Sequence, residues 1–132
     1  MRTLVVEDDF TSRRILQRMV APFGDCDIAV DGSEAVEAFK LAWSEGKPYD
    51  LVCLDIMLPT GDGQDVLRSI RAFEEAAQAT ERAKVIMTTA LDDARNVMTA
   101  FKHECDGYLV KPFEKRRLLE QVRSLGLLAL VE

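Results

Sequence analysis

The stretch that decides the fold is DLVCLD, residues 50–55. Its four central residues are all apolar, so the segment has no polar face, which is typical of a strand buried on both sides in a parallel sheet. Similar, mostly apolar runs occur at residues 4–6, 84–88 and 107–110, and a weaker one occurs at residues 27–30. The sequence therefore predicts five short strands spread along the chain.

The segments between these strands carry apolar residues at the spacing of three and four that amphipathic helices show. The expected helices lie around residues 15–23, 35–43, 66–73, 97–101 and 118–125. Gly24 is expected to end the first helix and Ser33 to cap the second. Asp92 or Asp93 is the expected cap of the fourth. Strands that alternate with helices predict right-handed βαβ units, and hence an α/β domain with helices on both faces of a parallel sheet.

Composition limits the class of protein. The chain has 132 residues, 48% hydrophobic and 30% charged, with a formal net charge of −6, which suits one soluble globular domain. The acidic balance argues against nucleic-acid binding, and no apolar run is long enough for a membrane helix. The N-terminus does not resemble a signal peptide, and Cys26, Cys53 and Cys105 fit neither a disulfide framework nor a zinc motif. We therefore expect a reducing, cytoplasmic location.

Polar side chains stand at the predicted carboxyl ends of four strands. Three acids, residues 7–9, follow the first strand, and Asp55 ends the third. Thr88 and Thr89 end the fourth strand, and Lys111 follows the fifth. Because ligands of such sheets bind beyond the carboxyl ends of the strands, we expect these groups to converge in one pocket.

Several acids in one pocket repel one another unless something compensates their charge. Three carboxylates within about 5 Å repel by roughly 3 kcal/mol per pair at an effective dielectric constant of about 20. One lysine cannot neutralise them, so the acids either share protons or surround a divalent cation. Oxygen ligands suit Mg²⁺, and a cation beside a carboxylate, a hydroxyl and an ammonium group can receive a phosphoryl group. The pocket therefore predicts phosphoryl chemistry with Asp55 as the nucleophile.

Four motifs in order along the chain carry a family resemblance. They are LVVEDD at residues 4–9, LDIMLP at 54–59 followed by Asp62-Gly63, MTTA at 87–90 and YLVKPF at 108–113. With these motifs the chain resembles the receiver domain of two-component response regulators, of the stand-alone chemotaxis-regulator type. The resemblance implies a flavodoxin-like, doubly wound sheet of five parallel strands in the order 2-1-3-4-5, with five helices on two faces. It also implies a single receiver domain over residues 1–132, with its core at about 2–125 and an apolar tail at 126–132.

The resemblance implies a metal site. Asp8 and Asp55 would bind Mg²⁺, or Mn²⁺, directly, and the backbone carbonyl of Met57 would be a further ligand. Glu7 would fill the other acidic position and act through a water molecule. This pair of acids is preferred to the next pair along the chain, because Arg13 then falls where the family often has an arginine on the first helix.

The resemblance also implies which residues meet the phosphoryl group. Asp55 would be the phosphoacceptor, Thr89 would bond one phosphoryl oxygen, and Lys111 would pair with another. The Lys111–Pro112 peptide bond is expected to be cis. Thr89 and Tyr108 would form the switch, in which Tyr108 changes rotamer as Thr89 moves toward the phosphate.

The implied function is phosphorylation-controlled signalling. A sensor histidine kinase or a histidine phosphotransfer protein would donate the phosphoryl group, and the fourth helix, fifth strand and fifth helix would bind a downstream protein. We expect no output domain, no DNA or membrane partner, a monomer or weak homodimer, and no enzymatic activity beyond its own phosphorylation and dephosphorylation.

The alternative is an Mg²⁺-dependent phosphohydrolase that passes through an aspartyl phosphate, although Met57 stands where that class usually has a second acid. A flavin-binding module is disfavoured, because acids occupy the place of its phosphate loop.

One position departs from what the family usually has, and two others are positions that tune the family's dephosphorylation rate. Glu104 stands at a glycine position, which predicts either left-handed backbone with strain of about 1 kcal/mol or a rebuilt turn. Met57 and Leu91 have no polar side chain to orient attacking water, which predicts a long-lived phosphoryl group. The apolar tail predicts either an extra helical turn that covers the core or a patch for a partner or a second copy.

Overall fold

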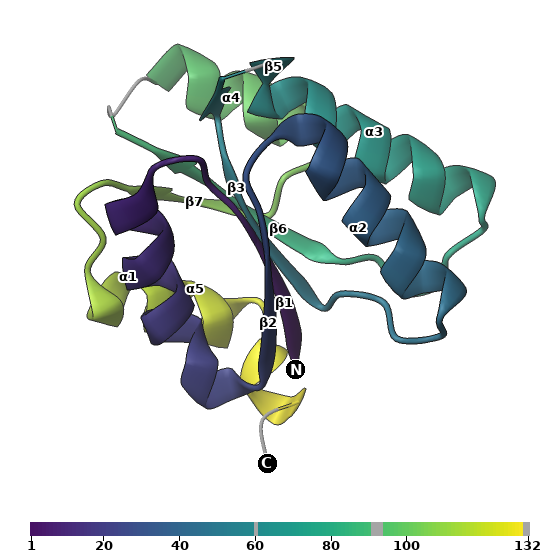
Figure 1. The fold of residues 1–132 in the computed structure, drawn as a ribbon, viewed down its shortest axis with the longest axis horizontal. Helices are drawn as coiled ribbons and strands as arrows, with labels where there is room; N and C mark the ends of the chain where they lie inside the picture. Colours follow the sequence, from purple (N-terminus) through teal and green to yellow (C-terminus); the bar gives the residue numbers. More distant parts are fainter. Residues whose placement is uncertain (60, 91–93, 131–132) are drawn as a thin grey trace.

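The chain folds into one parallel sheet between two layers of helices (Figure 1). The computed structural model describes all residues except 60, 91–93 and 131–132. Within the described residues the main sheet has the order β2-β1-β3-β6-β7, and all neighbouring strands are parallel. Its strands are β1 (Arg2–Val6), β2 (Asp25–Ala29), β3 (Leu51–Asp55), β6 (Lys84–Thr89) and β7 (Gly107–Val110). In sequence order this is 2-1-3-4-5, so the predicted flavodoxin-like fold is confirmed.

The helices divide between the two faces of the sheet (Figure 1). Helices α1 and α5 cover one face, and α2, α3 and α4 cover the other. The described helices are α1 (Phe10–Val20), α2 (Gly32–Ser44), α3 (Gly63–Ala76), α4 (Ala94–Lys102) and α5 (Lys115–Ser124), with short 3₁₀ turns η1 (Ala21–Phe23) and η2 (Leu127–Leu130). None of the described helices has the length and apolar character needed to cross a membrane.

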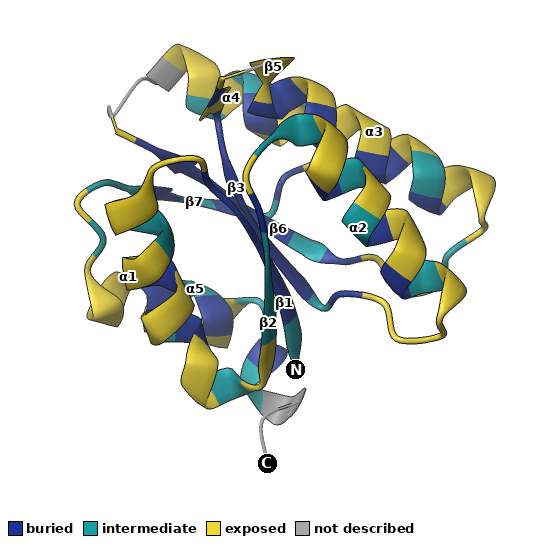
Figure 2. Cartoon of the chain, viewed as in Figure 1, coloured by how far each residue is buried: buried dark blue, intermediate teal, exposed yellow. Residues whose placement is uncertain are grey.

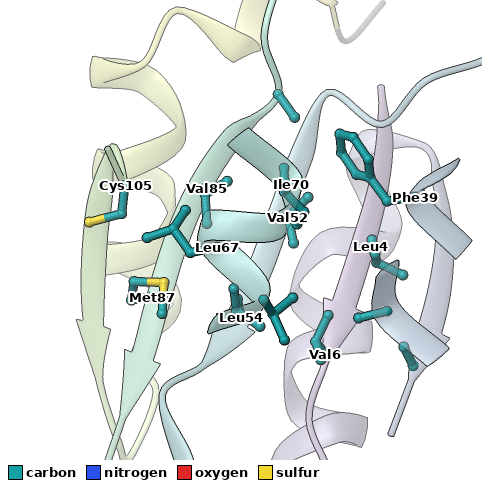
Figure 3. Close-up of a cluster of buried hydrophobic side chains, with 14 of the residues drawn as sticks. Leu4, Val6, Phe39, Val52, Leu54, Leu67, Ile70, Val85, Met87 and Cys105 are labelled. Atoms are coloured by element: carbon teal, nitrogen blue, oxygen red, sulfur yellow. The ribbon is translucent and has the colours of Figure 1, made fainter. Parts of the chain in front are cut away.

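Alternation along the strands builds two cores. In β1, Leu4 and Val6 face α2 and α3, whereas Val5 faces α1 and α5. Every residue of β3 is buried, as the DLVCLD pattern predicts, and Figure 2 shows this burial along the central strands. Figure 3 shows the core under α2 and α3, which also contains Phe39, Val52, Leu54, Leu67, Ile70, Val85, Met87 and Cys105.

The start of α2 differs from the expectation. The N-cap is Asp31, whose Oδ1 accepts a hydrogen bond from the Glu34 N–H at 2.8 Å. The prediction of Ser33 as cap was wrong, because Ser33 already lies inside the helix. Asp31 has the extended backbone and the short acceptor side chain that an N-cap needs.

Two further segments differ from the sequence-based expectation. Helix α1 ends at Val20 and not at residue 23, because Pro22 has no N–H to continue the α-helical hydrogen bonds, and residues 21–23 tighten into η1. The loop expected after β3 contains a short antiparallel pair, β4 (Met57–Leu58) and β5 (Gly61–Asp62). This pair carries the chain from the end of β3 to the start of α3.

Glu104 has left-handed backbone, the first of the two alternatives expected at this glycine position, with φ at 72°. Arg71 of α3 supports this turn, because its Nε donates a hydrogen bond to the Glu104 carbonyl at 2.9 Å. Arg82 pairs with the Glu104 carboxylate at 2.6 Å and holds the pKa of that carboxyl below its usual range. The turn is therefore strained, and basic side chains from other segments stabilise it.

The apolar tail packs onto the molecule. Leu127 is buried and Leu128 is half-buried in the core that α1 and α5 cover. These two residues contribute to the core, but they lie in the separate 3₁₀ turn η2 and not in an extra turn of α5, which ends at Ser124. The roles expected of Leu91, Asp92 and Asp93 concern residues outside the described part of the chain.

Candidate functional site

Four strands end at one edge of the sheet and bring the predicted site residues together. The register pairs Asp55, the last residue of β3, with Thr88 near the end of β6. Glu7 directly follows β1, and Lys111 directly follows β7. Because the strands are parallel and in register, residues far apart in the sequence meet at this edge.

Lys111 joins the two buried acids of the site. Its Nζ lies 2.5 Å from Oε1 of Glu7 and 3.1 Å from Oδ2 of Asp55. Glu7 is fully buried and Asp55 is 4% exposed, so water solvates neither carboxylate well. Burial opposes a charged lysine, but the contacts with both carboxylates outweigh it and raise the pKa of Lys111. The ammonium group therefore stays charged.

Glu7 ionises unusually for a glutamate. Burial, with a side-chain hydrogen bond to Asp55 as the next cause, raises the pKa of Glu7 to about 7. Lys111 and the backbone N–H of Asp9, which is 3.1 Å from Oε2 of Glu7, oppose this rise. At neutral pH and without a cation, the Glu7 carboxyl thus carries a proton for part of the time.

Three acids at this edge of the sheet have the composition of a metal site. One carboxylate oxygen from each of Glu7, Asp8 and Asp55 lies within 4.8 Å of the other two. Glu7 and Asp55 are buried, whereas Asp8 is exposed, so the cluster is reached from solvent on the side of Asp8. An all-oxygen donor set fits Mg²⁺ or Mn²⁺. Asp9 instead caps α1, and its Oδ2 accepts a hydrogen bond from the Ser12 N–H at 2.9 Å.

The loop after β3 fixes Asp55. Its Oδ1 accepts a hydrogen bond from the Met57 N–H at 3.0 Å. Gly63, the first residue of α3, packs so closely that a Cβ at this position would overlap the Asp55 carbonyl oxygen. The Gly63 N–H also donates to the Ile56 carbonyl at 2.7 Å. Only glycine allows this approach, so the Asp62-Gly63 part of the motif holds the start of α3 against the Asp55 backbone.

The predicted switch residues lie on neighbouring strands. Thr89 is buried at the end of β6, and its carbonyl accepts a hydrogen bond from the Lys111 N–H at 2.7 Å. Tyr108 is half-buried on β7, and its ring meets Phe101 of α4 edge-on with ring centroids 6.4 Å apart. The Lys111–Pro112 bond is cis, as the resemblance implies. The chemical roles of Thr89 and Tyr108 stay predictions.

Two other predicted residues lie beside the acids. Nη1 of Arg13 donates to the carbonyl oxygens of Glu7 and Asp8, each at 3.4 Å, and so supports the acidic loop from α1. Met57 begins β4 with its side chain 75% exposed, and the metal-binding role of its carbonyl stays a prediction. Thr88 is fully buried as a strand residue, and its hydroxyl has no hydrogen-bond partner among the described residues.

The sequence analysis did not predict that three polar side chains of α3 are buried. Gln64, Arg71 and Glu74 are buried on the same helix as Leu67. The spacings from 64 to 67, 71 and 74 are three, four and three residues, so the helical period alone places them on one face. This spacing is the signal that would have found them. Polar and charged residues are usually exposed, and for this reason these three residues were not predicted to be buried.

A family model described as the response regulator receiver domain matches residues 3–123. Among curated proteins, the regulatory protein VanRB of Enterococcus faecalis is 36% identical over 126 residues, which cover 95% of this chain and 52% of that protein. Chemotaxis protein CheY of Treponema pallidum is also 36% identical over 126 residues, which cover 94% of this chain and 81% of CheY. The chain thus spans about half the length of VanRB and most of the length of this CheY.

Solved structures have the same fold. A chain of the CheX–CheY–BeF₃–Mg²⁺ complex from Borrelia burgdorferi matches with a TM-score of 0.83 and 29% identity, over 96% of this chain and 89% of that one. A chain from the co-crystal of Saccharomyces cerevisiae Ypd1 with the Ssk1 receiver domain matches with a TM-score of 0.84 over 99% of this chain and 92% of that one. The second match is 24% identical and therefore supports only the fold.

Proposed function

Because the chain belongs to the family of response regulator receiver domains, we propose that it is a phosphorylation-controlled switch with Asp55 as the phosphoacceptor. The observation that carries this proposal is the contact of the Lys111 ammonium with the Asp55 carboxylate, within a cluster of three acids at the carboxyl edge of the sheet. The family is one of signalling domains. The proposed chemistry therefore acts on the chain itself and does not turn over a metabolite.

The proposed reaction is an in-line transfer from a phosphohistidine. The Asp55 carboxylate attacks phosphorus, an O–P bond forms as the N–P bond breaks, and the leaving imidazole takes up a proton. The Met57 N–H orients one Asp55 oxygen. Lys111 contacts the other and would stabilise the charge on the phosphoryl oxygens. The Thr89 hydroxyl would donate a hydrogen bond to one of those oxygens.

The acids of the pocket would hold Mg²⁺ or Mn²⁺. We assign direct binding to Asp8 and Asp55, a further ligand to the Met57 carbonyl, and contact through water to Glu7. The three-acid cluster supports this assignment, and the related CheY from Borrelia burgdorferi was solved with Mg²⁺. When bound, the ion neutralises part of the charge on the carboxylates and on the incoming phosphoryl group.

The proposed output is a change of partner at the surface of α4, β7 and α5. Thr89 and Tyr108 would connect the site to this surface, where Met98 is 71% exposed and Phe101 is 46% exposed. The donor would be a sensor histidine kinase or a histidine phosphotransfer protein, and the receiver of the signal a downstream protein. CheY of Borrelia burgdorferi was solved in complex with CheX, which supports a protein partner. A monomer or weak homodimer and a cytoplasmic location, where thiols stay reduced, complete the proposal.

The test uses a small acyl phosphate as donor. The protein is incubated with acetyl phosphate and Mg²⁺, and its intact mass is measured for the wild type, for Asp55→Asn and for the exposed control Asp65→Asn. We expect one adduct of about 80 Da in the wild type and in the control, and none in Asp55→Asn. An adduct that persists in Asp55→Asn would refute the phosphoacceptor. Multiple turnover of a phosphate ester would favour the phosphohydrolase alternative.

A further inference from the structure

Four polar side chains form one layer at the carboxyl edge of the sheet. One residue of each of β1, β3, β6 and β7 faces the core that α1 and α5 cover: Val5, Cys53, Ile86 and Leu109. Because side chains alternate along a strand, the residues two positions further on face the same side. These residues are Glu7, Asp55, Thr88 and Lys111. The first and last lie just beyond their strands, but their N–H groups still bond to the neighbouring strands, at the carbonyls of Ala29 and Thr89.

Thr88 lies between Lys111 and the acids that Lys111 contacts. Strand β6 stands between β3 and β7, and the register pairs Thr88 with Asp55 on one side and with Leu109 on the other. Lys111 follows β7, yet its ammonium contacts Asp55 beyond β3 and Glu7 beyond β1. The Lys111 side chain therefore crosses the end of β6 beside Thr88.

The Thr88 hydroxyl costs the folded protein stability. Thr88 is fully buried, and its Oγ1 has no hydrogen-bond partner among the residues that the structure describes. A buried hydroxyl without a partner loses its hydration and gains nothing in return. Valine has nearly the same shape without this cost. Because proteins break such a local rule mainly at functional sites, the hydroxyl calls for a functional explanation.

The Lys111 ammonium can use this hydroxyl. An ammonium group has three N–H donors, and a hydroxyl oxygen has two lone pairs. The contacts of Lys111 with Glu7 and Asp55 use two of these donors, and the third can bond another acceptor. In the unmodified protein the two carboxylates draw the ammonium toward β1 and β3. The Thr88 hydroxyl lies on the other side of Asp55, toward the strand from which Lys111 comes.

We propose that Thr88 is a positioning residue of the phosphoacceptor site: its hydroxyl accepts a hydrogen bond from the Lys111 ammonium during phosphoryl transfer and holds the ammonium beside Asp55. The inference rests on the proposed function, because the reaction in question is the phosphorylation of Asp55. As an Asp55 oxygen bonds to phosphorus, the carboxylate loses its charge and attracts the ammonium less strongly. An interaction that is absent before the reaction and forms during it raises the rate. A hydroxyl without a partner in the unmodified protein fits this role.

The experiment compares the rate of labelling with stability. Thr88→Val removes the hydroxyl and Thr88→Ser keeps it. Thr3→Val is the matched control at a buried threonine near the amino end of β1. Asp55 is labelled with acetyl phosphate at increasing concentrations in the presence of Mg²⁺, labelling is followed by intact mass, and urea unfolding measures stability.

We expect Thr88→Val to lower the saturating labelling rate about tenfold, the factor that a hydrogen bond to a charged group supplies. The half-saturating concentration of acetyl phosphate should stay within about twofold of the wild type, because the hydroxyl acts in the transition state and not in binding. The urea midpoint of Thr88→Val should equal or exceed that of the wild type, because an unpaired hydroxyl is removed. Thr88→Ser should recover most of the rate, and Thr3→Val should label like the wild type.

Three results would overturn the proposal. The first is an equal labelling rate in Thr88→Val and the wild type. The second is an equally slow rate in Thr88→Ser and Thr88→Val, because packing and not the hydroxyl would then set the rate. The third is a urea midpoint of Thr88→Val clearly below that of the wild type, because the hydroxyl would then already have a partner in the unmodified protein.

Two further outcomes are decisive. If Thr88→Val does not fold, Thr88→Ala takes its place: slower labelling than in Thr88→Ser supports the proposal, and labelling at the rate of Thr88→Ser overturns it. If the wild type takes up no phosphoryl group, the proposed function fails and the role of Thr88 fails with it. Equal labelling of the wild type and Thr88→Val is a different result, because it refutes the role of Thr88 and leaves Asp55 as the phosphoacceptor.

Discussion

Replacement of Arg71 by methionine will strongly destabilise the protein. Arg71 is 8% exposed and lies at the end of the sheet opposite the candidate site. Its guanidinium donates to Oε1 of Glu74 at 2.7 Å, to the Ala83 carbonyl at 2.8 Å, to the Glu104 carbonyl at 2.9 Å and to Oδ2 of Asp106 at 2.9 Å. One side chain thus connects α3 with the segments before β6 and β7.

The size of the effect follows from what the substitution leaves behind. Glu74 is 2% exposed, and among the residues that the structure describes its carboxylate then keeps only the Ala83 N–H at 2.7 Å and the distant Nε of Arg82 at 3.6 Å. Removal of one partner of a buried ion pair costs about 3–5 kcal/mol, because the other charge stays buried. Asp106 is 25% exposed and accepts from the Val85 N–H, so solvent reduces its share. We expect a loss of about 3–5 kcal/mol in the free energy of unfolding.

Urea unfolding followed by circular dichroism measures this loss. The control is Arg68→Met, which removes an exposed ion pair with Asp65 on the same helix and should cost less than about 0.5 kcal/mol. The double variant Arg71→Met/Glu74→Met should recover most of the stability, because no buried charge is left unpaired. A single variant within about 1 kcal/mol of the wild type, or a double variant no more stable than the single one, would refute the reasoning.

Three further predictions concern backbone and thiol chemistry. Glu104→Gly should raise the melting temperature by a few degrees, because glycine adopts φ 72° without strain, whereas Glu104→Ala should not raise it; equal melting temperatures would contradict the strain. Gly63→Ala should cost about 1–3 kcal/mol and slow acetyl phosphate labelling of Asp55, whereas Gly61→Ala, which has open space around it, should do neither; a fully active and stable Gly63→Ala would show that the close approach is unimportant. Burial raises the pKa of the Cys53 thiol to about 12, so a thiol reagent at pH 8 should modify it only after unfolding; rapid labelling of the native protein would contradict this.

The amino-acid sequence alone determined the order of strands and helices, because alternating burial and helical spacing are local patterns. It also determined which polar residues gather at one edge, since in a parallel sheet the residues after each strand must meet there. Asp55, Lys111 and the acids after β1 were found in this way. The family pattern left two alternatives for Glu104, left-handed backbone or a rebuilt turn, and the structure has the first.

Only the tertiary structure decided how those residues interact. Lys111 contacts both Glu7 and Asp55, and burial raises the pKa of Glu7. Both facts depend on distances between separate strands. The same holds for Gln64 and Arg71, whose polar side chains face the interior because their partners come from α4 and from the segments before β6 and β7. Spacing in the sequence states which face of a helix a residue occupies. The residues that contact this face come from elements that are distant in the chain. Their packing determines the burial of the side chain, its pKa and its hydrogen bonds.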